Sequence, residues 1–135
     1  MNEDSTGLAC CGDDCARCPR RLATVAADER RLAALAELWH RVGFREYLPT
    51  SAEMRCGGCA SIDTCAHGIR ECARQRGAAT CGTCADYPCA RLRRVLERTD
   101  SVASRVRSLC SPEEYRLLCD AFFSKRQNLE SARSR

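Results

Sequence analysis

The sequence has few large aromatic side chains for a chain of 135 residues. It contains only three Phe, three Tyr and one Trp, and much of its apolar content is Ala and Cys. Large apolar side chains bury the most area on folding, so a core that is poor in them is weakly stabilised. The length suits one compact domain. We therefore expect one domain that depends on cross-links as well as on its core.

Several signals that would indicate other locations or activities are also missing. No run approaches the roughly 18 apolar residues that a membrane helix needs, so no membrane association is expected. The opening residues MNEDSTGLACC carry acids where a secretory signal carries basic residues, which favours a cytoplasmic location. Neither HExxH nor a Gly-rich phosphate loop occurs, so we expect no enzyme chemistry of these classes and favour a protein that is not an enzyme.

Thirteen cysteines are the most unusual feature of what is present. In a reducing cytosol, clustered cysteines indicate metal or redox sites, and an odd number argues against a closed disulfide framework. A CxxC pair lets two thiolates reach one ion at about 2.3 Å. Such pairs occur at Cys15/Cys18, Cys56/Cys59 and Cys81/Cys84. The pattern predicts bound metal, with zinc favoured over iron.

The remaining cysteines and the two histidines divide by context. His67 follows Cys65 by two residues, and it is either a ligand or a neutral loop residue, whereas His40 lies on an amphipathic segment and is expected at the surface. Cys10, Cys110 and Cys119 are not expected to bind metal, because the first directly precedes another cysteine and the other two have the spacing of core residues. The candidate ligands are Cys11, Cys15, Cys18, Cys56, Cys59, Cys65, His67, Cys72, Cys81, Cys84 and Cys89.

These candidates exceed the eight ligands that about two tetrahedral zinc ions require. The sequence does not decide their pairing. The two dense cysteine segments suggest two groups, in which Cys56 and Cys59 join Cys65, His67 or Cys72, while Cys11, Cys15 and Cys18 join Cys81, Cys84 or Cys89.

Apolar periodicity predicts a mainly α fold of about four helices around the cysteine-rich loops. One long helix is expected from about residue 20 to 45, with Leu22 and Val25 extending its apolar stripe, and Gly43 is expected to end it. A short helix is expected at 69–75, and helical segments at 90–98 and 102–109.

The clearest local signal is Ser111-Pro112-Glu113-Glu114, where Ser suits an N-cap, Pro the first helical position and Glu114 a capping box. Thr50 and Glu53 offer a second capping box. Apolar periodicity is lost beyond Lys125. We therefore expect a single metal-binding domain over residues 1–127 and a flexible tail over 128–135.

Longer motifs carry a family resemblance. The run CGGC, GIRECARQRG and TCGTCADYPCARL within Cys56–Leu92, together with the opening CGDDCARCP, resembles the family catalogued as domain of unknown function 3795, over residues 10 to about 95. The resemblance implies metal binding and no particular activity, and it places His67 at a position where similar sequences have cysteine. The cysteines that it marks are Cys11, Cys15, Cys18, Cys56, Cys59, Cys72, Cys81, Cys84 and Cys89.

Two functions follow as hypotheses. The first is a binding or adaptor module, held together by structural zinc, with an unknown protein partner. The second is an iron–sulfur protein for electron transfer or redox sensing, since Cys11-x3-Cys15-x2-Cys18 has a cluster-like spacing. A thiol redox pair is disfavoured because no strand–helix–strand unit is evident. Nucleic acid is not an expected partner, because the arginines of 91–107 lack interleaved aromatic residues.

Overall fold

The computed structural model describes residues 7–58, 65 and 67–134. In this part of the chain the only β pairing is an isolated bridge between Leu8 and Asp14. The helices are α1 (Pro19–Val25), α2 (Glu29–Arg41), α3 (Ile69–Gln75), α4 (Ala90–Val106), α5 (Pro112–Leu118) and α6 (Lys125–Arg133). Three short turns accompany them, namely η3 (Cys81–Thr83), η4 (Arg107–Leu109) and the π-helical η5 (Cys119–Phe123). The predicted mainly α fold is confirmed, with more helices than the four expected.

The expected single helix over residues 20–45 is wrong, because it is divided into α1 and α2. Ala27 adopts a left-handed φ of 53°, which interrupts the helix between the two. Asp28 then caps α2 by accepting a hydrogen bond from the backbone N–H of Arg31 at 3.0 Å. Leu22 and Val25 are 51% and 75% exposed, so neither continues the buried stripe of α2.

The expected capping boxes are present. Ser111 accepts from the N–H of Glu114 at 3.1 Å, while the Glu114 carboxylate accepts from the N–H of Ser111 at 2.9 Å, and α5 begins there. Thr50 and Glu53 make the same reciprocal pair of hydrogen bonds. Gly43, with φ of 86°, follows the end of α2 as predicted.

The C-terminal end differs from the flexible tail expected for residues 128–135. In the structure α6 continues to Arg133, and its Leu129 is completely buried. The helix contacts η3, where a Cβ on Gly82 would overlap the backbone of Leu129. Lys125, at the start of α6, is buried and forms an ion pair with Asp13, with 2.8 Å between Nζ and Oδ1. The C-terminal helix therefore packs against the loop that contains Asp13.

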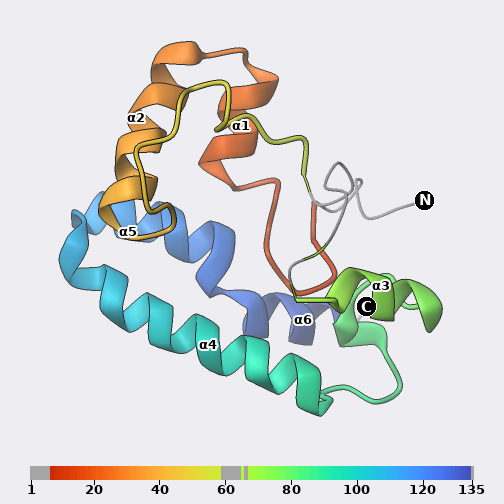
Figure 1. The fold of residues 1–135 in the computed structure, drawn as a ribbon. Coiled ribbons are helices and arrows are strands. Elements are labelled where there is room, and N and C mark those ends of the chain that lie inside the picture. Colours follow the sequence, from red (N-terminus) through yellow and green to blue (C-terminus); the bar gives the residue numbers. More distant parts are fainter. Residues whose placement is uncertain (1–6, 59–64, 66, 135) are drawn as a thin grey trace.

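Two clusters of buried residues form the core, and α4 contributes to both. The aromatic core lies where α1, α2 and α5 meet the C-terminal part of α4 (Figure 1), and it consists of Ala23, Leu32, Leu35, Ala36, Leu38, Trp39, Val42, Met54, Val106 and Leu118. The cysteine-rich core lies among α3, α6 and the N-terminal part of α4 (Figure 1), and it consists of Ala9, Cys10, Cys11, Ile69, Ala73, Cys81, Leu92, Val95, Leu96 and Leu129.

None of the helices in the described ranges is long and apolar enough to span a membrane.

Candidate metal centre

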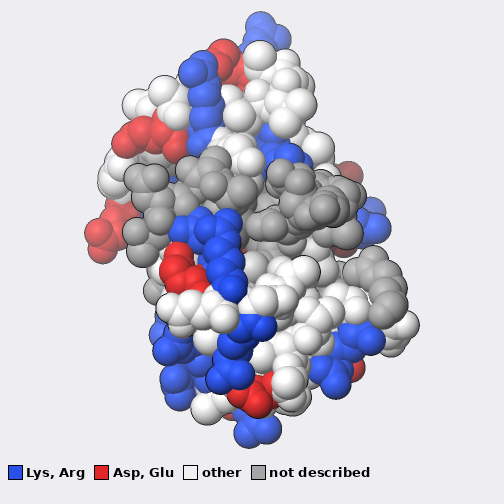
Figure 2. All heavy atoms as spheres, turned by 90° about the vertical axis from the view of Figure 1, so that its right-hand side faces the viewer, with Lys and Arg blue, Asp and Glu red and all other residues white. Residues whose placement is uncertain are grey.

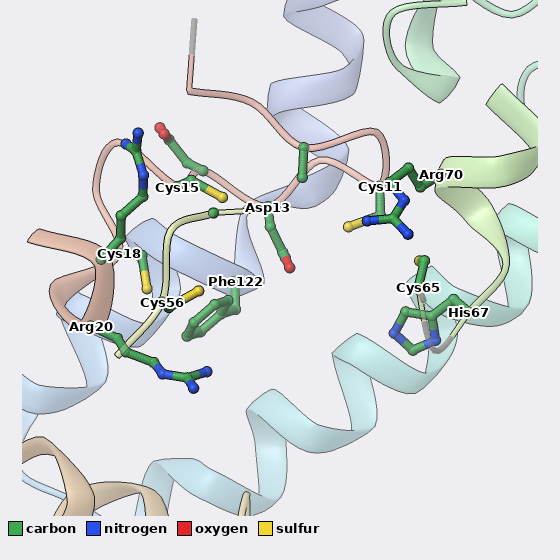
Figure 3. Close-up of a pocket in the computed structure, with 14 residues that line it drawn as sticks. Cys11, Asp13, Cys15, Cys18, Arg20, Cys56, Cys65, His67, Arg70 and Phe122 are labelled. Carbon is green, nitrogen blue, oxygen red and sulfur yellow. The ribbon is translucent and has the colours of Figure 1, made fainter. Parts of the chain in front are cut away.

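The first thiol-bearing cavity, called here the N-terminal cavity, lies beside the loop that precedes α1. Its volume is about 290 Å³. Figure 3 shows Cys18 and Cys56 near one another at one end of this cavity, and Cys11 and Cys65 toward the other end. The candidate ligands that line it are Cys11, Cys15, Cys18, Cys56, Cys65 and His67.

Hydrogen bonds hold Cys56 against α1, although the two lie far apart along the chain. The backbone N–H of Cys56 donates to the hydroxyl of Thr24 at 2.9 Å. The guanidinium of Arg20 donates to the carbonyls of Met54 and Glu53 and so anchors the segment that leads to Cys56. Burial is the main cause that raises the pKa of the Cys18 thiol. Backbone hydrogen bonds with Arg21 and Arg20 lower that pKa in part, and the nearby Cys56 thiolate raises it.

His67 lies at the boundary of this cavity. Partial burial lowers the pKa of its imidazole, and the charges of Lys125 and Arg98 lower it further. The lowered pKa favours the neutral imidazole, which is the form that ligates metals. His67 is exposed, and it also lines a third cavity, which contains Arg98 and Lys125.

The second thiol-bearing cavity, called here the α3–α4 cavity, has a volume of about 340 Å³. Cys72 comes from α3, Cys81 from η3, and Cys89 immediately precedes α4. The tight turn of η3 is capped by Thr80, whose hydroxyl accepts from the N–H of Gly82 at 3.1 Å. Four of the candidate ligands line this cavity, namely Cys72, Cys81, Cys84 and Cys89.

The electrostatics of Cys81 show that these thiols share one neighbourhood. Burial is the main cause that raises the pKa of its thiol to about 12, and the thiolates of Cys10, Cys89, Cys72 and Cys84 add to the effect. Like charges held this close repel one another, so the group is stable either protonated or in the presence of a compensating cation.

Arginines line both cavities, together with Asp13 and Asp14 in the first and Asp86 in the second. Figure 2 shows several Lys and Arg side chains, with fewer acids, in the lower half of one face of the molecule. The arginines that line the N-terminal cavity are Arg20, Arg21 and Arg70, and those that line the α3–α4 cavity are Arg76, Arg91 and Arg94.

The two cavities group the candidate ligands differently from the sequence-based expectation. Cys72 lies with Cys81, Cys84 and Cys89, and not with Cys56. The ligands of the opening loop, from Cys11 to Cys18, share a cavity with Cys56, Cys65 and His67. The cavities differ from the expected groups because the Arg20 and Thr24 hydrogen bonds fold residues 53–56 back onto α1. Cys59 lies outside the described residues.

The cysteines expected not to bind metal line neither of these cavities. Cys10 is buried, and its thiol lies 3.5 Å from the Ala79 carbonyl, to which it donates. Cys110 packs against the aromatic core, and Cys119 is half-buried on η5. His40 is exposed on α2, as expected.

The donor set suits a thiophilic metal, but the side chains are not placed around a coordination centre. Within the described ranges, no group of three or more His, Cys, Asp or Glu side chains could hold an ion as placed. No disulfide joins the twelve described cysteines. Thiolate and imidazole are the ligands that zinc and iron–sulfur clusters use, so the residue types fit these metals.

Comparison with known proteins identifies the family of this chain. The model of a family described as protein of unknown function (DUF3795) matches residues 7–94, which is more than half of the chain. The chain belongs to this family. The DUF3795 match includes every candidate ligand from Cys11 to Cys89, and it ends within α4, before α5 and α6. No curated protein and no solved structure gives a significant match to the chain.

Proposed function

We propose that this member of the DUF3795 family is a structural zinc protein, and that Cys72, Cys81, Cys84 and Cys89 hold one ion. The observation that carries the proposal is that these four cysteines line one cavity. Four thiolates complete a tetrahedral zinc site and leave no position for water or substrate. Zinc held there supplies a cross-link between α3, η3 and the start of α4.

A second zinc ion is proposed for the N-terminal cavity. Cys18 and Cys56 are neighbours there, and Cys15 is tied to Cys18 by the CxxC turn, in which the N–H of Cys18 donates to the Cys15 carbonyl at 3.3 Å. Cys59 stays a predicted ligand by its CxxC spacing from Cys56. Cys11, Cys65 and His67 are then the surplus donors of this cavity.

Closed zinc sites have no open coordination position for a reaction, so they stabilise the fold. Such a role supports a binding or adaptor module with a protein partner. Apolar side chains exposed on α1 and on the loop after α2 suit such recognition. They are Leu22, Val25, Tyr47 and Leu48. Scattered exposed apolar residues are common on monomers, so we rest the proposal on the thiols.

An iron–sulfur cluster in the N-terminal cavity is the second candidate function. Five described cysteines line that cavity, and three of them follow the cluster-like spacing Cys11-x3-Cys15-x2-Cys18. Three arginines and two aspartates, Asp13 and Asp14, line the same cavity, and the arginines would offset part of the negative charge of a cluster with four thiolates. This function would be electron transfer or redox sensing.

Purification without air, followed by elemental analysis and a visible spectrum, tests both proposals. We expect a colourless protein with about two zinc ions per chain. Cys84→Ser should remove one equivalent, while Cys110→Ser, which alters a cysteine outside both cavities, should remove none. A brown protein with about four irons and acid-labile sulfide per cluster would replace the zinc proposal by the iron–sulfur one.

A further inference from the structure

A third cavity, called here the aromatic cleft, lies between the two cores and has a volume of about 490 Å³. Its apolar wall is a trio of rings packed edge to face. The Trp39 ring centroid lies 5.5 Å from that of Phe44 and 5.9 Å from that of Phe122, and the two Phe rings are 6.2 Å apart. Such mutual packing fixes the rings, so the wall is preformed. The volume lies in the range of about 300 to 1,000 Å³ typical of small-molecule sites.

Among the described residues, the charged side chains that line the aromatic cleft are all basic. They are Arg20, Arg45, Arg98 and Lys125. Arg20 and Arg45 donate to backbone carbonyls, and neither forms an ion pair in the described part of the chain. Lys125 pairs with Asp13, which lies outside the cleft.

Arg98 differs from the other cations because its guanidinium has no hydrogen-bond or ion-pair partner among the described residues. It is an exposed residue of α4. The five donors of a guanidinium match the paired oxygens of a carboxylate or phosphate. Core packing accounts for the aromatic trio, but it does not account for three arginines around one cavity that have no ion-pair partner among the described residues.

We propose that the aromatic cleft binds a small organic anion with a flat apolar body. The apolar body lies against Phe44 and Phe122, and the anionic group, a carboxylate or a phosphate, is held by Arg98. His67 lines both this cleft and the N-terminal cavity, so the ligand would occupy a site adjacent to the thiols. This site is separate from the proposed zinc ligands of the α3–α4 cavity, so anion binding in the cleft does not depend on zinc binding there.

Trp39 supplies the readout, because it is the only tryptophan of the chain and lines the cleft. Phenyl phosphate and phenylacetate are titrated into the full chain as purified, and Trp39 fluorescence is followed. At least one of the two should give a saturable change that weakens with added salt. The stronger probe identifies the anionic group as phosphate or carboxylate. Benzyl alcohol and benzylamine carry the same ring without the negative charge and should bind far more weakly.

The variant that tests the assignment is Arg98→Gln, and the matched control is Arg93→Gln, an exposed arginine of the same helix that does not line the cleft. Loss of a charge-assisted hydrogen bond should weaken the anionic probe about tenfold in Arg98→Gln. Arg93→Gln should bind it like the unaltered chain. The proposal is overturned if neither anion gives a saturable change, if benzyl alcohol binds as well as the anions, or if the two variants behave alike.

Discussion

The two cores of this small protein are built from different material. The aromatic core contains Trp39 and is flanked by all three phenylalanines, so it buries large apolar surfaces in mutual contact. The cysteine-rich core has no aromatic residue among its buried members and includes three cysteines and two alanines. The first can be stabilised by burial alone, because burial scales with apolar area. The second borders both thiol-bearing cavities and is the part that a metal cross-link would complete.

The largest expected effect is the loss of metal and of folded structure when a proposed ligand is replaced. A packing cysteine in the same core serves as the comparison. Cys81 and Cys10 are both buried there, at 9% and 4% exposure. Cys81→Ala should lose one metal equivalent and the folded structure around η3, because a structural zinc site contributes about 10 kcal/mol or more, comparable to the whole stability of a domain.

The matched variant Cys10→Ala should keep all of the metal and lower the free energy of unfolding by only about 1 kcal/mol. Metal analysis and thermal unfolding followed by circular dichroism measure both variants. Equal metal content in the two would mean that Cys81 is a packing residue like Cys10.

A smaller effect is expected in the aromatic core, where no metal is involved. Leu35 is 2% exposed at the centre of that core. Leu35→Ala should lower the free energy of unfolding by about 2 to 5 kcal/mol, since it removes buried methyl groups and leaves a cavity. Urea unfolding measures the loss, and metal content at low temperature should stay unchanged. Metal loss in this variant would show that the two cores are not separable.

The smallest effect is expected at the N-cap of α5. Ser111→Ala removes one half of the capping box and should lower the free energy of unfolding by about 1 kcal/mol, with no change in metal content. Ser108→Ala, which removes only a hydroxyl contact to the Arg105 carbonyl at 3.4 Å, should stay within about 0.5 kcal/mol of the unaltered chain. A similar loss in both variants would contradict the role of the cap.

Local signals in the sequence predicted local structure well. The Ser111 capping box, the helix at Ile69–Gln75 and the stop at Gly43 depend on residues within one or two turns of each other, and all three are confirmed. The same reasoning missed the break at Ala27, because Ala favours a helix and its left-handed φ is imposed by the chain around it. Asp28 was the available signal, since Asp is a strong N-cap residue.

Long-range features could not be predicted in this way. The helix α6 has few apolar residues, and it is held by the burial of Leu129 against η3 and by the ion pair from Lys125 to Asp13. The grouping of cysteines depends on two hydrogen bonds between α1 and a segment far along the chain, one that Arg20 donates to the Glu53 carbonyl and one that Thr24 accepts from the N–H of Cys56. Lys125 is the single lysine among 22 basic residues. This unusual residue type is a feature of the sequence that distinguishes the buried position 125 from the exposed arginines.

Hydrogen exchange of backbone amides, with and without a zinc chelator, tests most directly whether metal holds the cysteine-rich half of the molecule. After chelation, we expect the amides of α3 and η3 to lose protection, while those of α2 in the aromatic core keep most of theirs. Unchanged protection in α3 and η3 after the metal has been removed would contradict this expectation.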